Sequence, residues 1–149
     1  MSADNVALIR RWFDEVWNRG RLETIHELMA PECVGTGQGG GGVVIRGPQQ
    51  FQAFAERLRA AFPDIRVTIE DAFESGEKAV ARWSATMTHR GDQLGVPATG
   101  KSVRITGISM VRIVKGKIVE GWDNWDQLTM MQEIGAVGES KIALTAAGS

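Results

Sequence analysis

An aspartate near the end of the chain, Asp123, has the sequence surroundings of an acid–base group. Residues 117–128 have the pattern of a strand, in which successive side chains point to opposite faces. On that pattern Asp123 shares a face with Val119 and Trp125, so its carboxyl group would lose contact with water. Desolvation raises the pKa of a carboxyl group, and a carboxyl group that titrates near neutrality can both take and return a proton. The alternative is a buried ion pair between Asp123 and Arg82 on the neighbouring strand.

The face assigned to Asp123 depends on the preceding strand, over residues 103–114. Ile105 and Val111 lie on one face of that strand and need a matching apolar face on the strand that pairs with them. The opposite choice for the last strand would bury three polar side chains, which is the costlier arrangement. These side chains are Glu120, Asn124 and Asp126. We therefore expect Asp123 to face inward and to line an apolar pocket.

Three small residues share this inward face: Gly107, Ser109 and Gly121. Glycine weakens the interior of a strand, so its presence there needs a reason. One reason is space for a ligand, and the other is a bend or bulge in a strongly curved sheet. Both explanations stay open for Gly107 and Gly121.

Helices followed by strands are expected to position these residues. Apolar residues at spacings of three and four predict helices over residues 4–18, 22–29 and 49–62. Alternation with a period of two then predicts strands, joined at the end by a Lys115–Gly116 hairpin turn. The predicted strands begin at Ile65 and cover residues 78–88, 103–114 and 117–128. This order predicts an α+β fold with helices against one face of an antiparallel sheet.

One domain, residues 1–135, accounts for this pattern, and residues 136–149 are expected to form a loose C-terminal tail. Residues 35–42 are rich in glycine, yet Pro31 rather than a strand precedes them and no phosphate-binding lysine motif follows. The segment is therefore interpreted as a flexible loop, with a cover over the pocket mouth as the alternative. We interpret Cys33 as a small, semi-buried hydrophobe rather than a nucleophile.

Composition excludes several classes of function. The 17 basic and 18 acidic residues are nearly balanced, so no nucleic-acid footprint is indicated. One cysteine and two distant histidines offer neither a disulfide nor a metal-ligand spacing. The first residues lack the pattern of a signal peptide, and no apolar run is long enough to span a membrane. The expected location is the cytoplasm.

Several motifs between residues 6 and 135 carry a family resemblance. They are Val16-Trp17-Asn18-Arg19-Gly20, Phe62-Pro63-Asp64, Thr88-His89-Arg90-Gly91, Leu94-Gly95-Val96-Pro97-Ala98-Thr99-Gly100-Lys101, Gly116-Lys117-Ile118-Val119-Glu120, Trp122-Asp123-Asn124-Trp125-Asp126 and Gln132-Glu133-Ile134-Gly135. On these residues the chain resembles the SnoaL-like polyketide cyclases, also called ester cyclases. These belong to the superfamily named after nuclear transport factor two (NTF2-like).

The resemblance implies a cone-shaped α+β barrel, usually a homodimer, that holds a hydrophobic small molecule of polyketide size. It also implies an aspartate on the last strand that catalyses an intramolecular aldol closure without metal or cofactor. That aspartate falls on Asp123, or in an alternative register on Asp126. The chain departs from the family pattern where a glutamine, a histidine and a pocket asparagine are replaced by Gly107, Ser109 and Gly35.

Further site residues are expected by resemblance or by their position in the strands. Aromatic side chains that would line the pocket are Trp17, Phe54, Trp83 and Trp125. His89, Ser109 or a backbone amide would stabilise the oxygen of an enolate formed during the reaction. His89 has an alternative role as an anchor for its own loop.

The sequence supports three functions. The first is an acid–base enzyme that uses Asp123 to cyclise or isomerise a hydrophobic carbonyl compound. The second is an epoxide hydrolase, for which Arg82 would match a family arginine while Ser84 replaces a needed aspartate. The third is a pocket that binds a small molecule without reaction.

Overall fold

The computed structural model describes residues 2–39 and 42–138 of the chain. The N-terminal helix α1 (Ser2–Trp12) continues into the π-helical segment η1 (Phe13–Asn18), and the short helix α2 (Glu23–Leu28) follows. The third helix, α3, covers Gly47–Ala61. The apolar stripes predicted for these helices are buried, and they join one continuous core with the sheet. The helical predictions are therefore confirmed.

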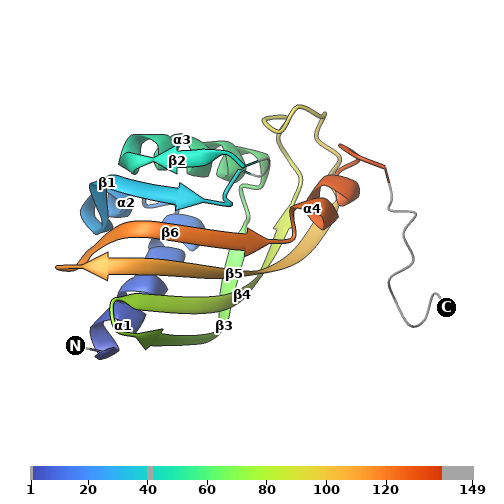
Figure 1. Ribbon diagram of the computed structural model, residues 1–149. Helices are drawn as coiled ribbons and strands as arrows, with labels where there is room; N and C mark the ends of the chain where they lie inside the picture. The colour runs from blue at the N-terminus through green and yellow to red at the C-terminus, as the bar shows by residue number, and fades with distance from the viewer. Residues whose placement is uncertain (1, 40–41, 139–149) are drawn as a thin grey trace.

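A single six-stranded sheet has the order β2-β1-β6-β5-β4-β3 (Figure 1). Its strands are β1 (Met29–Thr36), β2 (Val44–Arg46), β3 (Arg66–Ser75), β4 (Lys78–Thr88), β5 (Ser102–Val114) and β6 (Lys117–Trp125). The helix α1 packs against β3 and β4, and α3 packs against β1 and β2. Figure 1 shows α1 crossing behind the curved sheet. The α+β class is confirmed, and the sheet is curved without closing into a barrel.

Two strands were missing from the sequence prediction. The strand β1 occupies Met29–Thr36, where Pro31 was expected to end a helix and lead into a loop. β1 pairs in parallel with β6 and antiparallel with β2, so the sheet is not wholly antiparallel as predicted. The β1–β6 register shifts between Met29 and Val34, and Pro31 lies in this irregular stretch, where a missing N–H does little harm.

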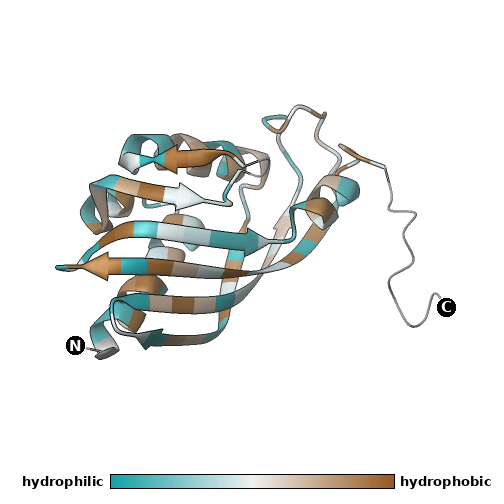
Figure 2. Cartoon of the chain, in the orientation of Figure 1, coloured by the Kyte–Doolittle hydropathy of each residue, from teal (hydrophilic) through white to brown (hydrophobic). Residues whose placement is uncertain are grey.

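Burial along β5 alternates as the sequence predicts, with every second residue buried from Val103 to Ile113. Figure 2 shows the corresponding hydrophobic and hydrophilic bands along the strands. The pattern of β6 is interrupted by a bulge, because Arg112 faces Glu120 while Ile113 faces Ile118.

Val119 is the extra residue in this bulge. Ile118 is consequently the buried residue, and Val119 is only partly buried, contrary to the prediction that Val119 would face inward. Beyond the bulge the predicted alternation holds.

The turns match the prediction more closely. Lys115 and Gly116 both have positive φ values, of 52° and 74°, as a two-residue hairpin between twisted strands requires. After β6 the helix α4 (Gln127–Glu133) packs against β5. Residues 139–149 of the expected tail lie outside the described residues. No helix in the described part of the chain is long and apolar enough to cross a membrane.

Candidate active site

A cavity of about 90 Å³ lies between the helices and the inward face of the sheet. Its wall is almost wholly apolar, and aromatic rings from α1, η1, α3, β4 and β6 supply much of it. The oxygen- and amide-bearing side chains among its described lining residues are three: Gln38, Ser109 and Asp123. All three belong to one hydrogen-bonded group, so the polar character of the cavity is concentrated at one place.

Asp123 and Ser109 form a directly opposed pair in the β5–β6 register. The Ser109 hydroxyl donates a short hydrogen bond to Oδ1 of Asp123. The same hydroxyl oxygen accepts a hydrogen bond from Nε1 of Trp83, at 3.0 Å. Because Trp83 already donates to the serine oxygen, the serine proton is directed at the carboxylate, and the orientation of Asp123 is fixed from the side of the sheet.

The second carboxylate oxygen of Asp123 is held from the loop that follows β1. The amide nitrogen of Gln38 donates to Oδ2 of Asp123 at 2.6 Å. Trp125 supports this loop by donating from Nε1 to the backbone oxygens of Gly37 and Gln38, each at 3.1 Å. The loop is therefore tied to β6 at the position where Asp123 projects from that strand.

Burial raises the pKa of Asp123 above the ordinary value of 3.8, and the hydrogen bonds from Ser109 and Gln38 act in the opposite direction. Desolvation is the larger influence. The residue keeps some accessible surface, while no arginine, lysine or histidine lies among the described residues that line the cavity. Asp123 is thus a desolvated carboxyl group without a cationic partner, which suits proton transfer.

The two glycines on the inward face do different things. Gly107 lies between Trp83 and Trp125 in the strand registers, and a Cβ atom there would come within 2.8 Å of both side chains. The Trp83 ring occupies the space where a side chain at position 107 would lie. Gly121 lines the cavity, and a Cβ atom there would meet only the Val111 side chain, at 3.9 Å. The explanation as ligand space therefore fits Gly121 and not Gly107.

A family model for the SnoaL-like polyketide cyclases matches residues 7–134. The chain belongs to the SnoaL-like polyketide cyclase family. It is therefore an enzyme of the cyclase type.

Similar proteins agree with this assignment. The chain is 30% identical over 131 residues to aklanonic acid methyl ester cyclase DauD of Streptomyces sp. (strain C5), covering 87% of this chain and 81% of the relative. The match to aklanonic acid methyl ester cyclase DnrD of Streptomyces peucetius has the same identity and covers 87% and 90%. Among solved structures, a SnoaL-like protein from Jannaschia sp. CCS1 has a TM-score of 0.82 at 27% identity, covering 92% of this chain and 95% of that one.

Most of the expected site residues of this SnoaL-like chain lie on the cavity wall. Trp17, Phe54, Trp83 and Trp125 line it together with Ser109 and Asp123. Their roles toward a substrate remain predictions. Cys33 also lines the cavity, and burial raises the pKa of its thiol to about 11, which keeps it neutral, as expected of a small hydrophobe.

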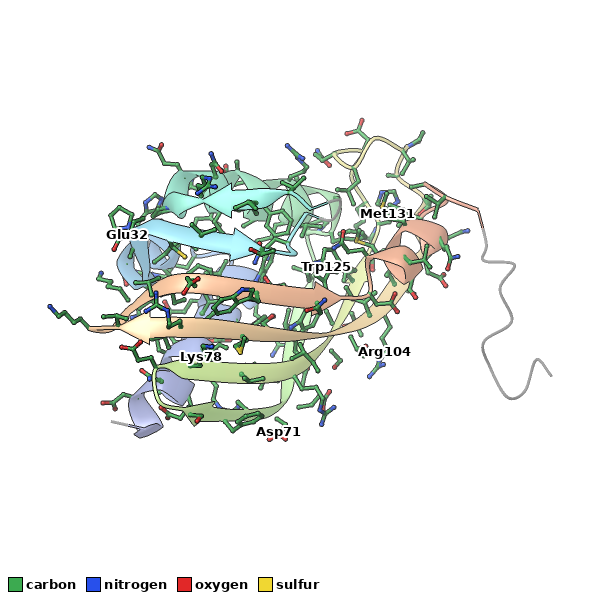
Figure 3. The ribbon with its side chains drawn as sticks, in the orientation of Figure 1. Glu32, Asp71, Lys78, Arg104, Trp125 and Met131 are labelled. Carbon is green, nitrogen blue, oxygen red and sulfur yellow. The ribbon has the colours of Figure 1, made fainter. Side chains whose placement is uncertain are left out.

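Arg82 does not belong to this group, and the proposed Arg82–Asp123 ion pair does not form. Arg82 and Ser84 lie on the outer face of β4, where Ser84 donates to Glu70 at 2.7 Å. Arg82 and Trp83 are adjacent in the strand and point to opposite faces, and Arg82 is not among the described residues that line the cavity. Figure 3 shows Arg104 of β5 on the same outer side of the sheet.

His89 and Asp126 also lie outside the described cavity lining. His89 is fully buried at the base of the loop after β4, where its Nδ1 accepts a hydrogen bond from the Thr99 N–H at 3.2 Å and its ring packs on Phe62. Asp126 caps α4 by accepting hydrogen bonds from the backbone nitrogen and hydroxyl of Thr129. The geometry thus favours Asp123 over Asp126 as the acid–base residue.

Gln38 is the site residue that sequence reasoning missed. It lies in the glycine-rich segment, 85 positions before the aspartate that it contacts. The available signal was the family asparagine replaced by Gly35, because a Cβ atom at Gly35 would come within 2.9 Å of Oε1 of Gln38. The loop thus supplies an amide through the space that Gly35 leaves open. No cluster of three potential metal ligands occurs among the described residues.

Proposed function

We propose that this chain is a cofactor-independent enzyme that closes a ring in a hydrophobic, polyketide-like carbonyl compound by an aldol reaction, with Asp123 as general acid and base. The observation that carries the proposal is a single desolvated carboxylate in an apolar cavity, oriented by two neutral donors. Membership in the cyclase family supports the same reaction class.

The reaction conserves all atoms of the substrate. The Asp123 carboxylate takes a proton from a carbon next to a carbonyl group, and the resulting enolate attacks a second carbonyl carbon of the same molecule. A carbon–carbon bond forms, and the π electron pair of the attacked carbonyl moves to its oxygen, which becomes an alkoxide. The protonated Asp123 then returns its proton to the alkoxide oxygen. A group that both takes and returns a proton works best when its pKa lies near the working pH, which is the direction in which burial shifts Asp123.

An enolate also needs a hydrogen-bond donor for its oxygen. Ser109 and Trp83 already donate within the site, and Trp125 donates to the loop. Trp12, Trp17 and Trp122 also line the cavity, and no hydrogen bond from their indole nitrogens is recorded among the described residues. These indoles are candidate donors, and Trp17 is the one that the family resemblance also favours.

The cavity volume limits the size of a ligand whether or not a reaction follows, so it does not favour a pocket that binds without reaction. A cavity of this volume holds only a few water molecules, so a polyketide could enter only if the cavity widened. The epoxide hydrolase is not retained, because Arg82 and Ser84 lie on the outer face of the sheet.

The test is turnover of an aklanonic acid methyl ester, chosen from the names of the relatives, and of smaller aromatic diketones, followed by chromatography for ring-closed product. Asp123→Asn should lower kcat by at least about a thousandfold, because the acid–base group is removed. Asp126→Asn is the matched control, since asparagine also caps helices and should leave turnover unchanged. Full turnover in Asp123→Asn would reject the proposal. Tight, unreactive binding that is equal in wild type and Asp123→Asn would favour the binding pocket.

A further inference from the structure

The approach of Gln38 to Asp123 is built into the backbone of its loop. Gly37 has φ of 92°, a conformation that favours glycine, and a Cβ atom there would collide with the backbone oxygen of Asp123. Gly35 leaves space for the Gln38 amide itself. Two glycines are thus needed, one for the close passage of the loop and one for the side chain.

Side chains from the end of β6 and the start of α4 hold the loop in this place. Trp125 donates to Gly37 and Gln38, and Nε2 of Gln127 donates to the backbone oxygen of Gly37 at 3.2 Å. These bonds come from the residues that follow Asp123 in the chain. The loop is therefore tied to the segment of the chain that carries Asp123.

The amide of Gln38 is held in this orientation at a cost. The side chain is 4% exposed, and its Oε1 is buried without a hydrogen-bond partner among the described atoms. A buried acceptor without a partner destabilises the folded state and calls for an explanation. The other end of the same amide donates to Asp123, so the contact with the carboxylate determines how the amide is placed.

Apart from Ser109 and Gln38, the groups around Asp123 offer no side-chain donor to its carboxylate among the recorded hydrogen bonds. The sheet contributes Ser109 and Trp83, the helices contribute aromatic rings, and β1 contributes the neutral thiol of Cys33. No other acidic or basic side chain lies among the described residues that line the cavity. Ser109 and Gln38 are the two side-chain donors that stabilise the charged carboxylate.

We propose that Gln38 is a positioning residue of the reaction centre, which reaches Asp123 through the space left by Gly35 and holds its carboxylate ionised and in one orientation. This inference rests on the proposed function of Asp123 as the acid–base group, yet its physical content can be measured without a substrate. It assigns the loop after β1 a role in setting the protonation of Asp123.

The first experiment follows the Asp123 carboxyl carbon by NMR during a pH titration, in wild type and in Gln38→Met, which keeps the length of the side chain and removes the donor. Without the donor the charged form is less stable, so the pKa of Asp123 should rise. Gly35→Ala should raise the pKa in the same direction, because the added Cβ displaces the amide. Gly39→Ala is the matched control in the same loop, since its Cβ would meet Val43 at an ordinary distance of 3.8 Å. An unchanged midpoint in folded Gln38→Met and Gly35→Ala would overturn the proposal.

The second experiment uses turnover. A base that is harder to ionise should lower kcat by roughly tenfold at acidic pH, and the loss should diminish as the pH is raised. KM should change little, because the Gln38 amide contacts Asp123 rather than the aromatic wall. A loss that is equal at every pH would assign Gln38 a purely structural role and contradict the proposal. If Gln38→Met shifts the titration while Asp123→Asn keeps full turnover, the positioning role stands and the proposed function fails.

Discussion

Ser109 stands directly opposite Asp123 across the β5–β6 pair, and its hydroxyl joins the Trp83 indole to the carboxylate. The position of the core tryptophan therefore helps to set the orientation of the Asp123 carboxylate, through the serine hydroxyl. Its proton cannot serve the substrate while it serves Asp123. Ser109 thus supports the aspartate in this chain.

Ser109→Ala should raise the pKa of Asp123, because one donor to the charged form is lost. It should also leave the Trp83 N–H without its partner and destabilise the fold by about 1–2 kcal/mol. NMR titration and urea unfolding measure these two effects. Ser84→Ala, on the outer face of β4, is the control and should leave the Asp123 titration unchanged. An unaltered titration in Ser109→Ala would contradict the hydrogen-bond assignment.

Gly107 and Gly121 should respond oppositely to alanine. Gly107→Ala places a methyl group against the Trp83 ring and should destabilise the fold by about 1–3 kcal/mol. In Gly121→Ala the added methyl group makes only an ordinary contact with the Val111 side chain, so the melting temperature should stay at the wild-type value. The methyl group occupies part of the cavity, so the affinity for an apolar ligand should fall. Thermal unfolding and ligand titration of both variants distinguish the two roles. Equal losses of stability would show that Gly121 also has a packing role.

The orientation of Asp123 could be predicted because local rules determine it. The Lys115–Gly116 turn fixes which strands pair, and alternation then carries Gly121, Asp123 and Trp125 to one face. The bulge at Val119 could not be predicted, since one added residue changes the face of its neighbours without changing composition. Without the bulge, the register set by the turn would place Asp123 opposite Ile108 on the outer face. The prediction held because it rested on keeping Glu120, Asn124 and Asp126 out of the interior.

Other parts of the site depend on contacts between distant residues. β1 contains Pro31 and Glu32, and its pairing with β6 and β2 makes it a strand. Gln38 reaches Asp123 across 85 positions, so no local pattern marks it. The placement of Arg82 was a different kind of error, because alternation already excludes Arg82 and Trp83 from the same face. The proposed ion pair between Arg82 and Asp123 did not take this rule into account.

His89 should prove structural rather than catalytic. Removing its buried ring in His89→Ala should destabilise the fold by roughly 2–4 kcal/mol, because a cavity forms beside Phe62 and the loop loses its anchor. The Asp123 titration should not change, since His89 is outside the described cavity lining. Thr99→Val, which removes the hydroxyl contacts to the His89 ring and to the Lys101 N–H but keeps the ring buried, should have a smaller effect in the same direction. A shifted Asp123 titration in His89→Ala would indicate a direct link to the site.

The stability of the protein should depend on the pH through Asp123. Its pKa in the folded state lies above the unfolded value, so the folded state binds more protons between the two values. Stability attributable to this group is therefore present below the unfolded pKa and is lost as the pH rises through the folded pKa. Asp123→Asn should unfold at higher urea concentration than wild type at pH 7, and the difference should narrow toward pH 4. A difference that widens on acidification would contradict the raised pKa.

The proposed reaction depends on Asp123 being a desolvated group ready for proton transfer. The most direct measurement is the titration of its carboxyl carbon by NMR in the free wild-type protein, with the signal assigned by its absence in Asp123→Asn. We predict a midpoint clearly above the ordinary value of 3.8, because burial outweighs the two hydrogen bonds. A midpoint at or below 3.8 would mean a solvated or strongly paired carboxylate, and Asp123 would then lose its role as the acid and base of this site.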